Sequence, residues 1–365
     1  MKGSHGPGIG LVLVFLLLYV VYTFAPALLY NMAEKKASAL SPADSAPVPS
    51  PSPEAESAPP VPAESLLPNF LEGASLPGRE EEASFTLYDV AVPQVLSVPA
   101  EDFLAAAVAC EMDLSSPPEA LKAQAVAAYT YYTRQKGSRQ VKGADFACDS
   151  ENWLVYVPQS AMQERWGEDY EANLSLLRDI VGEVRGQMLT WQGKPALTTY
   201  FAISSGSTEA AANVWDPSAA ESCPYLRPVA SPGDQLSDGY YSTNSFTAEQ
   251  FREAALSYFT EAALDFSGPA ENWLSDFEYT ASGTVKTALL GGVKVSGGDL
   301  RSAFSLRSAC FSLSAGEDGF TFAVRGWGHG VGMSQAGAVF LAKQGADYKE
   351  ILAHYYPGTV LTSPA

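Results

Sequence analysis

The sequence predicts an α+β fold: a mixed, mostly antiparallel sheet with packed helices and a groove, preceded by an N-terminal transmembrane helix. Helix-like and strand-like segments follow one another without the regular βαβ order of a parallel sheet. Glycine turns at Gly283, Gly291–Gly292 and Gly316–Gly319 separate short strand-like runs, as in hairpins. Ile9–Tyr30 contains 22 residues without a charge, which is long enough to cross a bilayer.

Three regions follow from the composition along the chain. Residues 1–32 are predicted to form a short cytoplasmic stub and a single-pass anchor in the cell membrane. Residues 33–84 are predicted to be a disordered linker rich in Pro, Ser, Ala and Glu, because nine prolines between Ser41 and Pro68 leave little apolar surface to bury. Residues 85–365 are predicted to be one folded domain, which we expect outside the cytoplasm.

Charge and cysteine content limit the classes of site. The formal net charge of -19 argues against a nucleic-acid partner, since binding phosphates needs clustered Lys and Arg. The four cysteines allow three disulfide pairings, and no Cys-x-x-Cys spacing marks a zinc site. We therefore expect neither a metal nor another cofactor.

Two helices are predicted near the start of the folded domain. Strand-like residues from Phe85 lead to a helix that Asp102 opens and that ends near Cys110. A second helix runs over Glu119–Arg134, with a serine of the Ser115–Ser116 pair as N-cap and prolines in its first turn. Further predicted elements are helices over Leu176–Val184, from Thr247 to Tyr258, and over Leu300–Phe304, Ser334–Lys343 and Tyr348–Tyr355, and a hairpin with arms Gln187–Trp191 and Leu197–Ala202.

Glu111 lies in the corner between the first two helices. Burial between apolar helices would raise the pKa of this carboxyl group toward the range useful for a general acid. The alternative interpretation is an exposed glutamate at a helix end.

Two glycine-containing segments are candidates for lining a ligand-binding site. Ser204–Ser205–Gly206 follows a strand-like run from Tyr200, and small residues there allow a ligand to approach the backbone; an ordinary turn is the alternative. Gly326–Gln335 alternates four glycines with Trp, His and Val. Glycine weakens a strand, so this density indicates a place where a ligand or a second backbone approaches closely. Its histidine, His329, is either structural or a site residue.

Together these segments resemble the stage II sporulation protein D family and the related amidase-enhancer proteins. The resemblance covers roughly Phe85 to Leu361. Its motifs are EM-x-x-S-x-P-x-EALKAQAVAA at Glu111–Ala128, YF-x-x-SSG-x-TE at Tyr200–Glu209, PYLRPV at Pro224–Val229, GWGHGVGMSQ-x-GA at Gly326–Ala338 and the ending ILAHYYPGT at Ile351–Thr359.

The resemblance implies a lytic transglycosylase that cleaves peptidoglycan glycan strands stripped of their peptides, during sporulation and engulfment. It implies Glu111 as the single catalytic acid, with the C6 hydroxyl of N-acetylmuramic acid as the nucleophile. It implies glycan contacts from the residues that match the motifs: Lys122, Gln124, Tyr200, Ser204, Ser205, His329 and Gln335. The implied partners are glycan strands, a cell-wall amidase and other sporulation membrane proteins.

The chain departs from the family pattern at two places. Tyr129 stands where many relatives have Arg, which could contact a lactyl carboxylate. The loop after this helix contains Cys148 without the second Cys and the His that bind zinc in some relatives.

Two alternative functions stay open. The first is a non-catalytic glycan-binding scaffold that stimulates a cell-wall amidase. The second is a metal hydrolase built on His329 and a cysteine.

Overall fold

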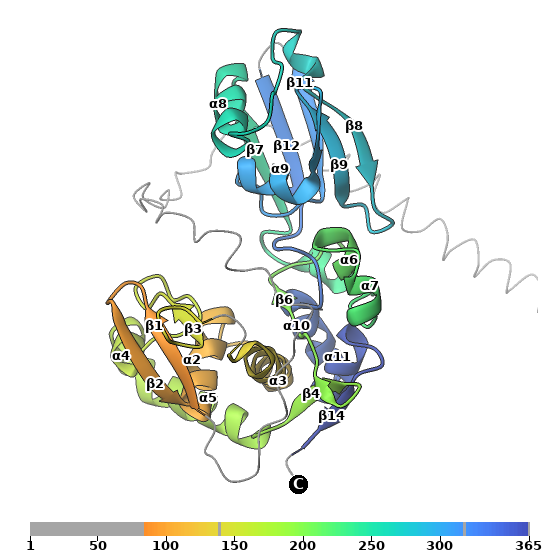
Figure 1. Ribbon diagram of the computed structural model, residues 1–365. Coiled ribbons are helices and arrows are strands. Elements are labelled where there is room, and N and C mark those ends of the chain that lie inside the picture. The colour runs from red at the N-terminus through yellow and green to blue at the C-terminus, as the bar shows by residue number, and fades with distance from the viewer. Residues whose placement is uncertain (1–83, 138–139, 317–318, 364–365) are drawn as a thin grey trace, which may run out of the picture. The chain divides into compact units, whose positions relative to one another are not determined.

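The computed structural model describes residues 84–137, 140–316 and 319–363 (Figure 1). The predicted membrane anchor and linker lie outside these residues. Within the described ranges, no helix combines the length and the apolar character that crossing a membrane requires. The fold is α+β with several small sheets, most of their strand pairs antiparallel, as the sequence predicts.

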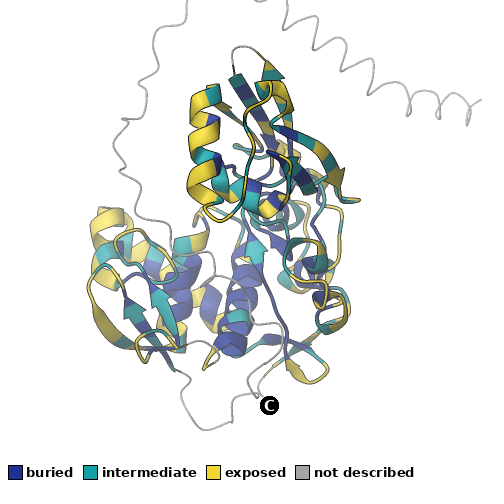
Figure 2. Cartoon of the chain, turned by 45° about the horizontal axis from the view of Figure 1, so that its top comes forward, coloured by how far each residue is buried: buried dark blue, intermediate teal, exposed yellow. Residues whose placement is uncertain are grey.

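The first part of the domain surrounds a long central helix. Its elements are β1 (Ser84–Asp89), β2 (Gln94–Pro99), α2 (Ala100–Glu111), α3 (Pro118–Gln135), β3 (Phe146–Cys148), α4 (Gln159–Trp166), a 3-10 helix (Gly167–Asp169) and α5 (Tyr170–Glu183). Helix α3 packs against α2 and α5 and, from the C-terminal part of the chain, against α10 (Gln335–Lys343) and α11 (Tyr348–Tyr355). Its side chains are buried along nearly the whole helix (Figure 2).

The start of α3 corrects one local prediction. The helix begins at Pro118, its N-cap is Pro117, and no side chain caps it. The predicted N-cap serine is therefore wrong. The reason is that the residue before a proline avoids helical backbone angles, so two successive prolines move the first helical residue past both serines.

The middle of the chain forms short strands and a second hydrophobic cluster. The elements are β4 (Met188–Trp191), β5 (Lys194–Pro195), β6 (Tyr200–Phe201), α6 (Ala211–Val214), α7 (Ala219–Ser222), a 3-10 helix (Pro232–Leu236), β7 (Tyr241–Phe246), α8 (Ala248–Tyr258), a 3-10 helix (Ala270–Asn272), β8 (Leu274–Tyr279), β9 (Val285–Leu290), β10 (Val293–Ser296), α9 (Gly297–Ala303), β11 (Phe311–Gly316) and β12 (Gly319–Arg325). Phe251 of α8 stacks on Phe304 and Phe320, with ring centroids 4.4 Å and 3.9 Å away. The outer face of α8 is exposed (Figure 2).

Strand β6 pairs differently from the predicted hairpin. β4 pairs with β5 and with β14 (Val360–Thr362), both antiparallel. β6 instead pairs in parallel with β13 (Met333–Ser334), so that Tyr200 lies opposite Met333 and Phe201 opposite Ser334. The hairpin prediction is thus wrong for its second arm. This parallel pair brings the Ser–Gly segment and the glycine-rich segment together.

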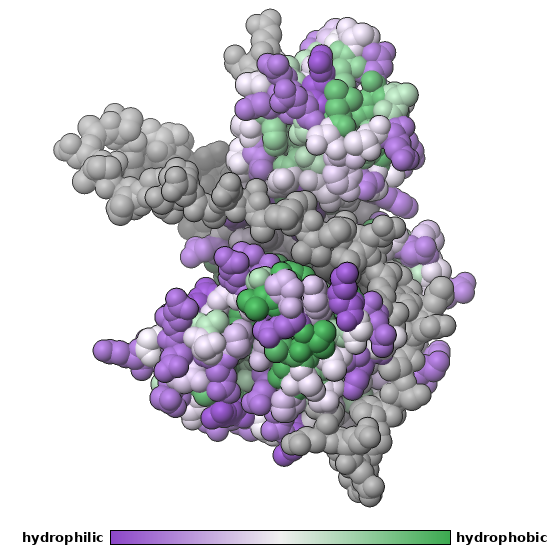
Figure 3. Space-filling model, turned by 60° about the vertical axis from the view of Figure 1, so that its left-hand side comes forward, coloured by the Kyte–Doolittle hydropathy of each residue, from purple (hydrophilic) through white to green (hydrophobic). Residues whose placement is uncertain are grey.

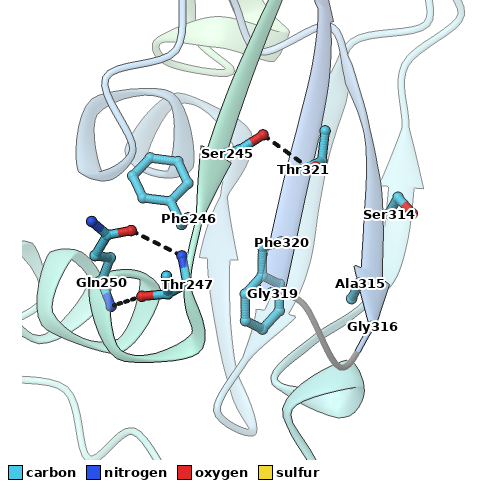
Figure 4. A pocket seen from close by; sticks show the side chains of 10 residues that line it. All are labelled: Ser245, Phe246, Thr247, Gln250, Ser314, Ala315, Gly316, Gly319, Phe320 and Thr321. Atoms are coloured by element: carbon cyan, nitrogen blue, oxygen red, sulfur yellow. Dashed lines mark hydrogen bonds between the residues drawn. The ribbon is translucent and has the colours of Figure 1, made fainter.

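The described part of one face of the molecule shows hydrophilic side chains, with apolar side chains gathered in limited patches (Figure 3). A 430 Å³ hollow lies between the start of α8 and the β11–β12 hairpin (Figure 4). Among the residues that the structure describes, the lining is made of Ser, Thr, Gln, Gly, Ala and Phe side chains.

Candidate active site

Glu111 and Gln335 form the centre of the candidate site. Glu111 is the last residue of α2, and Gln335 is the first residue of α10. The Nε2 of Gln335 donates a hydrogen bond of 3.1 Å to Oε2 of Glu111. Ser334 caps α10 by accepting from the backbone N–H of Gly337, and this fixes the first turn that carries Gln335. The structure thus joins two predicted site residues that are far apart in sequence.

The environment of Glu111 differs in part from the prediction. Its side chain reaches solvent, as in the alternative interpretation of an exposed glutamate at a helix end. Surrounding protein nevertheless removes enough water from the carboxylate to raise the pKa of Glu111, and the hydrogen bond from Gln335 opposes this in part. A carboxyl group with a raised pKa that solvent still reaches is suited to giving and taking a proton.

Two tyrosines lie near this carboxylate. The hydroxyl groups of Tyr132 on α3 and Tyr200 on β6 hydrogen-bond each other. Burial raises the pKa of both phenols well above the ordinary value, and the nearby charge of Glu111 contributes to both shifts. Tyr200, a predicted site residue, is therefore a neutral phenol beside the acid. Tyr132 lies within the helix predicted over Glu119–Arg134 and was not among the predicted site residues.

His329 is held by the backbone. Its Nδ1 accepts a hydrogen bond of 3.1 Å from the N–H of Val331, and its ring also hydrogen-bonds the backbone of Tyr200. Burial, followed by the charge of Arg301, lowers the pKa of His329 to about 3. A neutral imidazole that accepts at Nδ1 carries its proton on Nε2, so both nitrogens are engaged. This disfavours His329 as a metal ligand.

Lys122 is paired within the protein. Its ammonium lies 2.9 Å from Oε1 of Glu119 and also contacts Glu183 on α5. Glu119 in turn accepts from the backbone N–H of Tyr348 at the start of α11. Lys122 therefore links α3 to α5, and through Glu119 to α11. No described contact joins it to Glu111.

Gln124 and Ser204 are enclosed by protein. Gln124 is 0% exposed and its amide atoms have no hydrogen-bond partner among the described residues. Ser204 is 1% exposed. Neither side chain reaches the surface, so a ligand bound there would meet them only after a rearrangement. Ser205 is half-buried, and its carbonyl accepts from the Tyr240 hydroxyl at 2.9 Å.

Asp234 is a buried carboxylate that the sequence analysis did not single out. Its Oδ2 accepts from the backbone N–H of Ser204 at 2.7 Å and from the hydroxyl of Ser334 at 2.8 Å. Burial raises the pKa of Asp234, and these hydrogen bonds lower it in part. Asp234 therefore ties the Ser–Gly segment to the start of α10, one residue before Gln335. It lies in a 3-10 turn with Pro and Gly, which reads as an ordinary loop.

Two further residues of the sequence motifs, Glu209 and Tyr129, are enclosed by the protein. Oε1 of Glu209 accepts from Ala210 N–H and the Asn213 amide, at 2.8 Å and 2.9 Å, and Oε2 accepts from Thr280. This buried carboxylate is thus fully engaged. Tyr129 is 7% exposed, so its side chain offers little surface to a ligand.

Metal ligands are sparse in this region. Within the described residues, no group of three or more His, Cys, Asp or Glu side chains is placed to hold a metal ion. Cys110 and Cys148 are both free thiols. Burial raises the pKa of each to about 12, which keeps them protonated at neutral pH.

Comparisons with known proteins identify the family of the chain. A family model described as Stage II sporulation protein matches residues 88–191. Stage II sporulation protein D of Bacillus amyloliquefaciens is 34% identical over 292 residues, which are 79% of this chain and 81% of that protein. Its namesake from Bacillus subtilis (strain 168) is 34% identical over 287 residues, 78% of this chain and 80% of that protein. An amidase enhancer of the same strain is 27% identical over 301 residues, 69% of this chain and 39% of that protein. The chain belongs to the stage II sporulation protein D family.

Proposed function

We propose that this protein is a lytic transglycosylase that cleaves peptidoglycan glycan strands stripped of their peptides. The observation that carries the proposal is Glu111, a solvent-accessible carboxyl group with a raised pKa, hydrogen-bonded to Gln335. The side-chain hydrogen bond that Glu111 accepts among the described residues comes from Gln335 and not from a second carboxyl group. An ordinary glycosidase uses two carboxyl groups, so a single acid favours a substrate that supplies its own nucleophile.

The proposed reaction uses the same carboxyl group twice. Protonated Glu111 gives its proton to the glycosidic oxygen as the bond from that oxygen to C1 of N-acetylmuramic acid breaks. The C6 hydroxyl of the same sugar then attacks C1, and carboxylate Glu111 takes the hydroxyl proton. The product has a 1,6-anhydro ring, and Glu111 returns to its starting state. Gln335 orients the carboxylate, and Tyr200 and Ser205 line the approach.

The setting of this reaction is also part of the proposal. We place the domain on the outer side of the cell membrane, tethered through the N-terminal residues. We expect glycan strands as the substrate and a cell-wall amidase and sporulation membrane proteins as partners. An amidase would supply the stripped strands on which the reaction depends.

The test is product analysis of digested stripped glycan by mass spectrometry. The unmodified chain should release fragments with anhydro-muramyl ends, and Glu111→Gln should release none, since losing a general acid typically costs about 100- to 10,000-fold in rate. Asp113→Asn is a matched control, because it neutralises an exposed acid two residues away. Products with ordinary reducing ends would reject the transglycosylase reaction.

A glycan-binding scaffold is the second candidate, favoured by the amidase-enhancer relative and by Tyr129 in place of an arginine. In that case the unmodified chain yields no cleavage product. Glycan binding then survives Glu111→Gln, and added protein stimulates an amidase.

A further inference from the structure

A second surface lies on the same two chain segments as the candidate active site. An isolated β-bridge joins these segments at Ile203 and Trp327. The backbones of Ile203 and Trp327 exchange two hydrogen bonds, of 3.0 Å and 2.7 Å. Trp327 is the second residue of the glycine-rich segment Gly326–Gln335, and Ile203 lies three residues after Tyr200 along the chain. At about 3.3 Å per extended residue, Ile203 lies roughly 10 Å from Tyr200. A bound polymer can therefore reach both places.

Trp327 presents an exposed aromatic face beside an arginine. Its side chain is 46% exposed, although tryptophan is usually well buried. The guanidinium carbon of Arg307 lies 4.2 Å from the Trp327 ring centroid. The backbone carbonyl of Arg307 accepts from the N–H of Gly328, and its Nη1 donates to the Gly239 carbonyl at 3.3 Å. A stacked guanidinium keeps its remaining donors in a fixed plane, ready for a carboxylate.

The charge around this stack is unusual for the chain. Among the described residues, no carboxylate forms an ion pair with Arg307. The chain as a whole has a net charge of -19. The guanidinium of Arg307 is therefore a cation that can attract an anionic ligand to the Trp327 ring.

We propose that Trp327 and Arg307 form a second saccharide subsite, specific for a glycan that bears carboxylates. The indole face packs against a sugar ring, and the guanidinium binds the carboxylate of that sugar. The inference deepens the proposed function, because it assumes that the ligand of this site is a glycan. It also locates a cation for lactyl carboxylates in a chain that has Tyr129 instead of the usual arginine.

The test measures binding by the full chain carrying Glu111→Gln, so that cleavage does not interfere. The probes are stripped peptidoglycan strands, which bear lactyl carboxylates, and oligomers of N-acetylglucosamine, which bear none. Adding Arg307→Ala should weaken binding of the stripped strands about tenfold and leave the neutral oligomers unchanged. Trp327→Ala should weaken both, and Arg307→Lys should lose less than Arg307→Ala because it keeps the charge.

Arg252→Ala is the matched control, since it removes the same charge from an exposed position on α8. Thermal unfolding midpoints establish that each variant folds. Equal loss for both probes with Arg307→Ala, no loss for either, or no binding of either probe by the starting chain would overturn the inference. This experiment measures binding and not cleavage. The difference that Arg307 makes between the two probes can therefore be observed even if the unmodified chain releases no fragments with anhydro-muramyl ends.

Discussion

If the proposed reaction is correct, replacing Gln335 by alanine should raise the activity at alkaline pH relative to the activity at the pH optimum. Gln335 donates to Oε2 of Glu111, which favours the ionised carboxylate and so lowers its pKa against the larger effect of burial. Without that bond the pKa of Glu111 rises further. Glu111 then keeps its proton, and its role as general acid, at higher pH.

The size of the effect follows from the geometry. A hydrogen bond to a charged group contributes about 1.5–3 kcal/mol, and the lower end applies because the Glu111 side chain reaches solvent. Since about 1.4 kcal/mol is a factor of ten, kcat/KM on the alkaline limb should rise about tenfold relative to kcat/KM at the optimum. Loss of any glycan contact by Gln335 lowers kcat/KM at every pH, so the ratio isolates the effect on Glu111.

The assay is kcat/KM for stripped glycan across the pH range, for the unmodified chain and Gln335→Ala. Gln344→Ala is the matched control, because it removes the same side chain from the exposed C-terminal end of α10. Its profile should coincide with that of the unmodified chain. An alkaline limb that stays in place for Gln335→Ala, or moves to lower pH, would refute the assignment of Glu111 as an acid stabilised in its ionised form by Gln335.

Two further predictions concern stability and thiol chemistry. Gly332→Ala should destabilise the fold by more than about 2 kcal/mol in urea unfolding, because φ is +85° and the new methyl group would lie 1.9 Å from the Thr199 carbonyl oxygen. The matched control is Gly345→Ala, where φ is +95° and no atom lies near the added carbon, so only backbone strain should reduce the free energy of unfolding. Equal reductions for the two variants would show that the contact with the Thr199 carbonyl is unimportant. Iodoacetamide should alkylate Cys110 and Cys148 far more slowly in the native protein than in urea at pH 8, because burial raises the pKa of both thiols to about 12. Equal rates would contradict that environment.

Local features of the fold could be predicted from the sequence. The helix before Glu111, the buried central helix, and the caps at Thr247 and Ser334 follow from periodicity and from hydrogen bonds between near neighbours. The serine cap before Pro117 failed although it is local, because two prolines impose their own backbone angles.

Contacts between distant segments could not be predicted in this way. Lys122 matches a motif, yet its partner Glu183 lies on another helix. Asp234 lies in a segment that reads as a turn, and its importance comes from Ser204 and Ser334, to which it is hydrogen-bonded. Such partners depend on how helices and strands pack, which periodicity does not describe.

The sequence by itself determined the family motifs, the α+β class and Glu111 as the candidate acid, because these depend on residue identity and spacing along the chain. Only the tertiary structure decided that Gln335 contacts Glu111 and that the Glu111 side chain reaches solvent. It also decided that Arg307 stacks on Trp327. The physical reason is that the pKa and the ligand contacts of a side chain depend on all atoms within a few ångströms, and at this site those atoms come from segments widely separated in sequence.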